Sequence, residues 1–235
     1  MPNLIDFEWE RHVDGYEFLQ PAGELGLRWI RPINPLGEVI RYRPLDKHPA
    51  LFAIFASLDG SEKSFVHFVN TYGPLDGPFA EATSEELVDE ALDQWGSPLS
   101  FYTNVHAEMA ELFRYAQEAE HNGDFRSFVA AMKGTRRRIL GSMPSLEIDL
   151  RFFPGEARPG LVLVPQGLAD AMKLQMVQAV CEERQLRKCV NCGNWFAFGV
   201  SGERQRKSAH YCSNRCKQAQ YRKRKEDKHG IDPKT

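Results

Sequence analysis

Four cysteines near the C-terminus constrain this chain more than any other feature of its sequence. Cys189 and Cys192 form one pair and Cys212 and Cys216 a second, in the pattern C-x2-C-x19-C-x3-C. Two close pairs of this kind close a tetrahedral thiolate site, and soft sulfur ligands favour zinc over magnesium or calcium. Since protein thiolates fill all four positions, the sequence predicts one structural Zn²⁺ with no open position for catalysis.

Two disulfides are the alternative use of these four cysteines. No apolar signal segment opens the chain, so we expect a cytoplasmic, reducing location in which the thiols stay free. The fifth cysteine, Cys181, follows Val177 by four residues on a predicted helix. This spacing predicts a buried free thiol rather than a fifth metal ligand.

The segment around the second cysteine pair, YCSNRCKQAQYRKRKEDK at residues 211–228, predicts a helix with almost nothing to bury. Cys212 and Cys216 lie four residues apart and therefore on one helical face, which Ala219 continues. Ser213 stands where an N-cap is expected. A helix that is polar on all sides needs a reason other than core packing to form, and metal binding at its first turn supplies one.

Charge is divided between the two ends of the chain. Residues 184–235 hold fourteen Lys and Arg against four Asp and Glu, a net +10, whereas residues 1–183 hold sixteen against twenty-eight, a net −12. No apolar run is long enough to span a bilayer. We therefore expect an acidic domain over residues 1–183, a zinc module with a basic helix over 184–228, and a flexible tail over 229–235.

The pattern of residues 1–183 predicts an α+β domain that is mainly helical and carries antiparallel hairpins. Two hairpins are expected, one between strands 25–31 and 38–43 across the turn PINPLG, the other between strands 146–152 and 161–164. Helices are expected at 50–58, 62–72, 83–96, 97–121, 125–140 and 167–184. The last helix leads directly into the zinc module, which favours a rigid attachment.

The acidic domain offers no set of catalytic residues, and we expect it not to be an enzyme. His106 and Glu108 followed by a C-x-x-C imitate a zinc deaminase signature, but the proline is missing and both cysteines have better partners downstream. No phosphate-binding glycine loop, H-E-x-x-H or G-x-S-x-G is present. The domain is instead expected to sense a small-molecule ligand or to form a homodimer.

The C-terminal forty residues resemble the CGNR-type zinc-finger proteins of bacteria. The resemblance rests on the four cysteines, the Trp195-Phe196 pair, the YCS sequence at Tyr211 and the YRKRK sequence at Tyr221. Where the family has Gly-Asn-Arg, this chain has Lys-Gln-Ala at 217–219. The residues themselves predict a treble-clef-like module: a C-x-x-C-G turn, then a stretch that can fold as a hairpin with Trp195, Phe196 and Phe198 as the small core, then the helix with the last two cysteines. The resemblance implies a DNA-binding transcription regulator whose larger N-terminal domain senses a ligand.

The basic residues of the module point independently to nucleic acid. Positive side chains on a rigid scaffold most often meet duplex nucleic acid, with cations on phosphates and amides such as Asn214, Gln218 and Gln220 able to read base edges. The predicted contact residues are Arg204, Arg206, Lys207, Arg215, Lys217, Gln218, Arg222, Lys223, Arg224 and Lys225. DNA is favoured over RNA, because aromatic platforms for single-stranded bases are few. The alternatives are that the basic run binds an acidic partner protein, docks onto the acidic domain of this chain, or is only a solvated tail.

Overall fold

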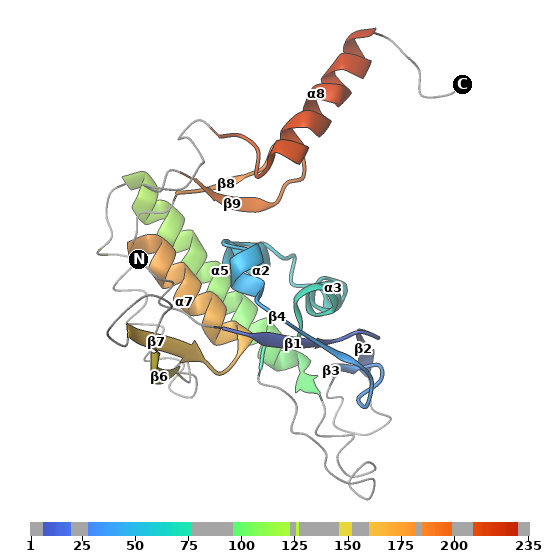
Figure 1. Cartoon of the computed structure of the whole chain (residues 1–235), viewed down its shortest axis with the longest axis vertical. Helices are drawn as coiled ribbons and strands as arrows, with labels where there is room; N and C mark the ends of the chain where they lie inside the picture. The colour runs from blue at the N-terminus through green and yellow to red at the C-terminus, as the bar shows by residue number, and fades with distance from the viewer. Residues whose placement is uncertain are drawn as a thin grey trace, which may run out of the picture.

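The computed structural model describes residues 7–19, 28–76, 96–122, 126, 146–151, 160–181, 185–198 and 209–229. Its helices and antiparallel sheets confirm the predicted α+β class (Figure 1). The helices are α1 (Pro44–Lys47), α2 (Leu51–Ala56), α3 (Glu62–Tyr72), α5 (Leu99–Asn122), α7 (Leu168–Cys181) and α8 (Asn214–His229). The strands are β1 (Trp9–His12), β2 (Tyr16–Leu19), β3 (Trp29–Pro32), β4 (Val39–Tyr42), β5 (Ser97–Pro98), β6 (Leu146–Arg151), β7 (Gly160–Pro165), β8 (Gln185–Lys188) and β9 (Trp195–Phe198).

The N-terminal strands form an interrupted antiparallel ribbon, and the hairpin predicted across PINPLG is wrong. β4 pairs with β1 and β3 pairs with β2, so neither strand pairs with the other. Residues 33–38 form an insertion opposite the shorter turn at 13–15, where the amide of Val13 donates to Glu38 O and that of Ile33 to Gly15 O. The turn-like PINPLG therefore interrupts the ribbon instead of reversing it.

A side chain from α3 fastens this ribbon to the helices. Asn70 Oδ1 accepts a hydrogen bond from the amide of Tyr16 at 2.7 Å, and its Nδ2 donates to Tyr16 O at 3.1 Å. Gly15 has a φ of +81°, and a Cβ there would lie 2.3 Å from Asn70 Oδ1. Glycine is thus needed at this position both for its backbone conformation and for the close approach of α3.

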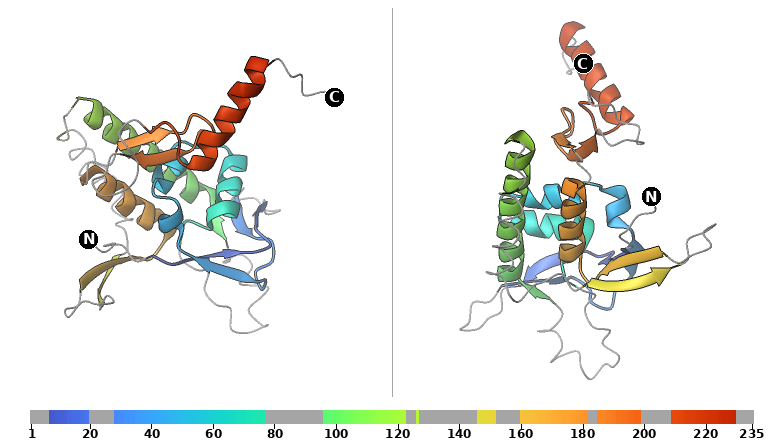
Figure 2. Two further views of the ribbon diagram at one scale, coloured as in Figure 1. Left: turned by 45° about the horizontal axis from the view of Figure 1, so that its top comes forward. Right: turned by 90° about the vertical axis from the view of Figure 1, so that its left-hand side faces the viewer.

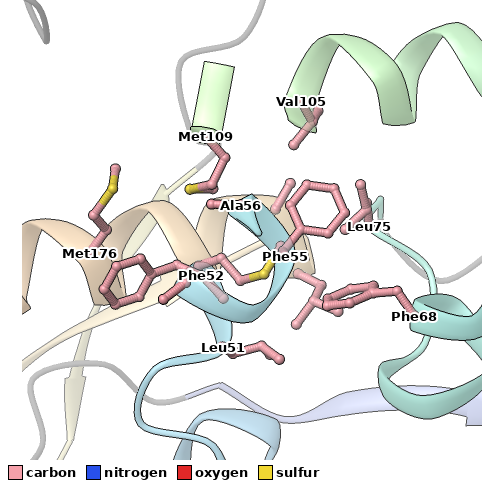
Figure 3. Close-up of a cluster of buried hydrophobic side chains, with 14 of the residues drawn as sticks. Leu51, Phe52, Phe55, Ala56, Phe68, Leu75, Val105, Met109 and Met176 are labelled. Atoms are coloured by element: carbon pink, nitrogen blue, oxygen red, sulfur yellow. The ribbon is translucent and has the colours of Figure 1, made fainter. Parts of the chain in front are cut away.

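The short helix α2 lies at the centre of the core (Figure 3). Leu51, Phe52 and Phe55 are at most 1% exposed, and a helix that is apolar on nearly every side is stable only when neighbours cover all of it. The helices α3, α5 and α7 surround α2 and contribute Phe68, Met109 and Met176 among other side chains (Figure 3). This arrangement makes α2 the element on which the larger domain is assembled.

Two buried polar contacts attach α7 to this core. Lys173 Nζ lies 3.0 Å from Glu108 Oε2 of α5, and the two side chains are 9% and 11% exposed. Gln175 accepts from the amide of Phe52 at 3.3 Å and donates to His48 O at 2.9 Å. Because α2 has no side-chain cap of its own, Gln175 serves one of its free N-terminal amides from another helix.

Several predicted elements are confirmed. The helix at 62–72 is α3, and the hairpin at 146–164 is the antiparallel pair β6 and β7. The helix at 97–121 begins two residues late, at Leu99, because Ser97 and Pro98 pair with β3 as the strand β5. The helix at 167–184 is observed as α7, which the structure describes to Cys181. The helices predicted at 83–96 and 125–140 lie almost wholly outside the described residues.

Candidate metal centre

The first cysteine pair lies in the turn of the β8–β9 hairpin. Strand pairing runs from Gln185 opposite Phe198 to Lys188 opposite Trp195, so the C-x-x-C sequence closes the hairpin. The amide of Gly193 donates to Cys189 O at 2.8 Å, and the amide of Cys189 donates to Asn194 O at 2.9 Å. The predicted hairpin follows this pair, whereas the observed hairpin surrounds it and uses the strand β8 that precedes it.

The second pair is presented by the start of α8. The hydroxyl of Ser213 accepts a hydrogen bond from the amide of Cys216 at 3.3 Å, which confirms Ser213 as the N-cap. Two contacts hold the preceding segment against the hairpin. The amide of Val190 donates to His210 O at 3.0 Å, and Arg187 Nη1 donates to Ala209 O at 3.0 Å. Backbone contacts of the hairpin and the cap of α8 therefore position both cysteine pairs.

The four thiols meet in one cluster that can hold a metal ion. Their sulfur atoms all lie within 4.8 Å of one another, with Cys192 Sγ 3.7 Å from Cys212 Sγ and the latter 3.5 Å from Cys216 Sγ. A tetrahedron with Zn–S bonds of about 2.3 Å has sulfur atoms about 3.8 Å apart. Disulfide sulfurs are bonded at about 2.05 Å, so these separations fit a metal site and do not fit disulfides.

The thiols of the cluster differ in their tendency to ionise. Burial opposes ionisation of Cys189, but hydrogen bonds from backbone amides, that of Cys192 first, outweigh it and lower its pKa to about 6. The hydroxyl of Ser213 lowers the pKa of Cys216. Burial and the neighbouring thiol of Cys216 raise the pKa of Cys212 to about 12. Four thiolates at these distances repel one another, and a bound divalent cation offsets that repulsion.

A very small apolar cluster supports the site. Its buried members are Cys189, Phe196 and Phe198, which are 2%, 4% and 6% exposed. Ala209 and Tyr211 pack against them from the segment before α8. The described part of the module has too small an apolar cluster to stabilise a fold alone, so a metal ion held by the thiols would add to its stability.

Trp195 does not belong to this small core, and its predicted place there is wrong. Successive residues of a strand face opposite ways, so Trp195 faces away from the side that Phe196 and Phe198 share. The Trp195 ring packs edge-to-face on Phe113 of α5 at 5.1 Å, and its Nε1 donates to Ser57 Oγ at 2.8 Å. The ring also joins the periphery of the large core. The metal module, which comprises β8, β9 and α8, thus contacts the larger domain through Trp195.

The basic helix α8 projects away from the remainder of the protein (Figures 1 and 2). Its predicted contact residues Arg215, Lys217, Gln218, Arg222, Lys223, Arg224 and Lys225 are all exposed. Cys216 and Gln220 are half-buried, whereas Ala219, expected on the same face as the two cysteines, is exposed. Arg204, Arg206 and Lys207 lie outside the described residues.

The remaining residues singled out in the sequence lie away from the thiol cluster. Cys181 is exposed at the end of α7, so the prediction of a buried thiol is wrong, because the last turn of α7 extends beyond the core. His106 is half-buried, packs against the rings of Phe55 and Phe65, and bonds Leu58 O through Nε2 at 3.1 Å.

No sequence pattern indicates the docking contact between Trp195 and Ser57, because a polar residue near the end of a short helix has no distinguishing feature. None of the helices in the described part of the chain combines the length and apolar character needed to cross a membrane.

No family model, curated protein or solved structure matches the chain. Function is therefore inferred from the chemistry of its own residues.

Proposed function

We propose that this protein is a DNA-binding transcription regulator in which a structural Zn²⁺ holds α8 for contact with duplex DNA. The observation that carries the proposal is the combination of a thiol cluster at one end of α8 with exposed cations along the rest of it. The helix stands clear of the larger domain, so a duplex can approach it (Figure 2). The acidic domain would then sense a small-molecule ligand or form the homodimer.

Zinc is the metal that suits the cluster best. Four thiolates are soft ligands, and the observed sulfur separations suit bonds of the length that zinc forms. A hairpin carrying one cysteine pair and a helix carrying the other give a treble-clef-like order of elements. That order, with the aromatic pair at 195–196 and the basic helix, is the resemblance to CGNR-type zinc fingers.

Duplex DNA suits the helix because its surface is cationic and narrow. Six Lys and Arg side chains are exposed between Arg215 and Lys225. An α-helix fits the major groove of B-form DNA, whereas the major groove of A-form RNA is too deep and narrow for side chains to read. An acidic protein surface is the second candidate partner, because the same positive charge would attract it. The fit of a helix to a groove does not favour this partner.

The metal is tested with two matched cysteine variants. Zinc content is measured by atomic absorption for the wild type, Cys216→Ser and Cys181→Ser. We expect one zinc per chain in the wild type and in Cys181→Ser, because Cys181 lies outside the cluster. Cys216→Ser removes one of four ligands and should lose the metal together with the fold of the module. Equal zinc in both variants would refute the assignment.

DNA binding is tested by fluorescence anisotropy on random-sequence duplex DNA across a range of salt concentrations. The logarithm of the affinity should fall linearly with the logarithm of salt concentration, with a slope of about −0.9 per neutralised phosphate. Replacing the four residues 222–225 by alanine should flatten that slope by up to about 3.6. Absence of binding at low salt by zinc-loaded protein would exclude DNA and favour the acidic protein partner.

A further inference from the structure

The exposed surface of α8 is not uniform, and its residue types are sorted by face. Successive residues of an α-helix are rotated by roughly 100°. Cys216 and Gln220, the half-buried residues of the described helix surface, lie four apart and define its covered face, on which Cys216 packs against the apolar cluster of the hairpin. The opposite face is the stripe formed by Asn214, Gln218, Tyr221 and Lys225, spaced by four, three and four residues.

Two rows of cations flank this stripe. Arg215 and Arg222 lie along one side of it and Lys217 and Arg224 along the other, each pair separated by seven residues, or two turns. Lys223 alone lies on the side of the metal ligands. The helix therefore presents amide groups and a tyrosine along its centre line with positive charge on both flanks.

This arrangement matches the cross-section of a major groove. The groove is about 12 Å wide, its floor carries the base edges, and phosphates line both of its walls. A helix lying in it needs hydrogen-bonding groups on the face turned to the floor and cations on both flanks. An acidic protein surface imposes no such division, since neutral amides at the centre of the contact would lower its charge complementarity.

The central stripe has the chemistry for reading bases. Side-chain amides donate to and accept from adenine at N6 and N7 in a bidentate pair. Gln218 lies in the middle of the stripe, one turn from Asn214 and just under one turn from Tyr221. Tyr221 is 70% exposed, and it belongs to neither apolar cluster of the described residues, so packing within them does not account for this exposed aromatic residue. The stripe from Asn214 to Lys225 is about 16 Å long, enough to cross several base pairs.

We propose that the face of α8 opposite the metal ligands enters the major groove, with Gln218 selecting adenine and the rows Arg215/Arg222 and Lys217/Arg224 binding the two phosphate backbones. This inference rests on the proposed DNA-binding function and adds the residues that determine specificity. It also assigns separate roles to the Lys and Arg side chains of α8, which form one basic cluster in the sequence.

The matched variants are Gln218→Ala and Gln220→Ala, which remove the same amide from opposite faces of one helix. Each zinc-loaded protein selects sites from a randomised duplex pool, and the enriched sequences are compared with those of the wild type. Gln218→Ala should lose an adenine preference at one position by about tenfold or more while the salt slope stays unchanged. Gln220→Ala should keep the wild-type motif. Zinc content shows that each variant retains the folded module.

The phosphate rows are tested separately by salt titration. The double variants Arg215→Ala/Arg222→Ala and Lys217→Ala/Arg224→Ala should each flatten the slope by about 1.8 and leave the motif intact. A wild type that binds no duplex DNA would refute the proposed function itself. A wild type that binds, together with a Gln218→Ala variant that keeps the motif or a Gln220→Ala variant that loses it, would refute only the assignment of the reading face.

Discussion

Replacing Trp195 by alanine should release the metal module from the larger domain while leaving the module folded. A fully buried tryptophan replaced by alanine costs about 3–5 kcal/mol, and the half-buried Trp195 is expected to contribute about half of that. The hydrogen bond from its Nε1 to Ser57 Oγ adds about 0.5–1 kcal/mol. Docking should therefore weaken by about 2–3 kcal/mol, a factor of about 30 to 150 in the ratio of docked to undocked forms.

Amide hydrogen exchange measures this directly. In Trp195→Ala, protection should fall at the end of α2 near Ser57, in α5 near Phe113, and in β9, where the two parts meet. Zinc content should stay at one per chain, because the ligands lie on the other side of the hairpin. Phe196→Ala is the matched control, since the neighbouring residue packs on the cysteine side and its loss should weaken metal binding.

Two results would refute this reasoning. Unchanged exchange at α2 in Trp195→Ala would mean that other contacts hold the module in place. Loss of zinc in Trp195→Ala equal to that in Phe196→Ala would mean that Trp195 supports the metal site after all. Ser57→Ala separates the two contributions, because it removes the hydrogen bond and leaves the ring packing on Phe113.

Two further predictions concern the larger domain. Burial raises the pKa of Asp76 above 3.8 despite the hydrogen bond that Ser97 donates to it. The protonated Asp76 therefore contributes stability that is present below pH 3.8 and is lost as pH rises through the folded pKa. The gain in melting temperature of Asp76→Asn over the wild type should thus be larger at pH 7 than at pH 3, and an equal gain at both would contradict this. Lys173→Met leaves the carboxylate of Glu108 buried without its partner and should lower the free energy of unfolding in urea by about 3–5 kcal/mol. Adding Glu108→Gln should recover part of this loss. No recovery would show that the packing of Lys173, and not its charge, stabilises the protein.

The metal ligands could be predicted from the sequence because the spacing of the four cysteines is typical of a thiolate metal site. Two cysteines in a C-x-x-C turn and two on one face of a helix are each close through local structure, so only one long-range contact remained to be formed. The structure brings the four thiols together as predicted. The cap at Ser213 was equally local and is also confirmed.

The N-terminal ribbon could not be predicted in the same way. The strands at Trp29 and Val39 pair with residues 9–19 and not with each other, and strand patterns indicate a face but not a partner. The same limit explains Trp195, since alternation shows that it faces away from Phe196 but not which core receives it. The predicted burial of Cys181 is wrong for a related reason, because helical spacing does not show where the neighbouring core ends.

The contact between Gln175 and the start of α2 has a consequence for synthesis of the chain. Phe52 and Gln175 are separated by 123 positions, which take about 6 to 25 s to translate at about 5–20 residues per second. During this interval the apolar helix α2 has left the ribosome without the helix that caps and covers it. The nascent chain therefore leaves the α7-facing side of this apolar helix uncovered until α7 emerges, and chaperones that bind apolar segments have several seconds in which to act.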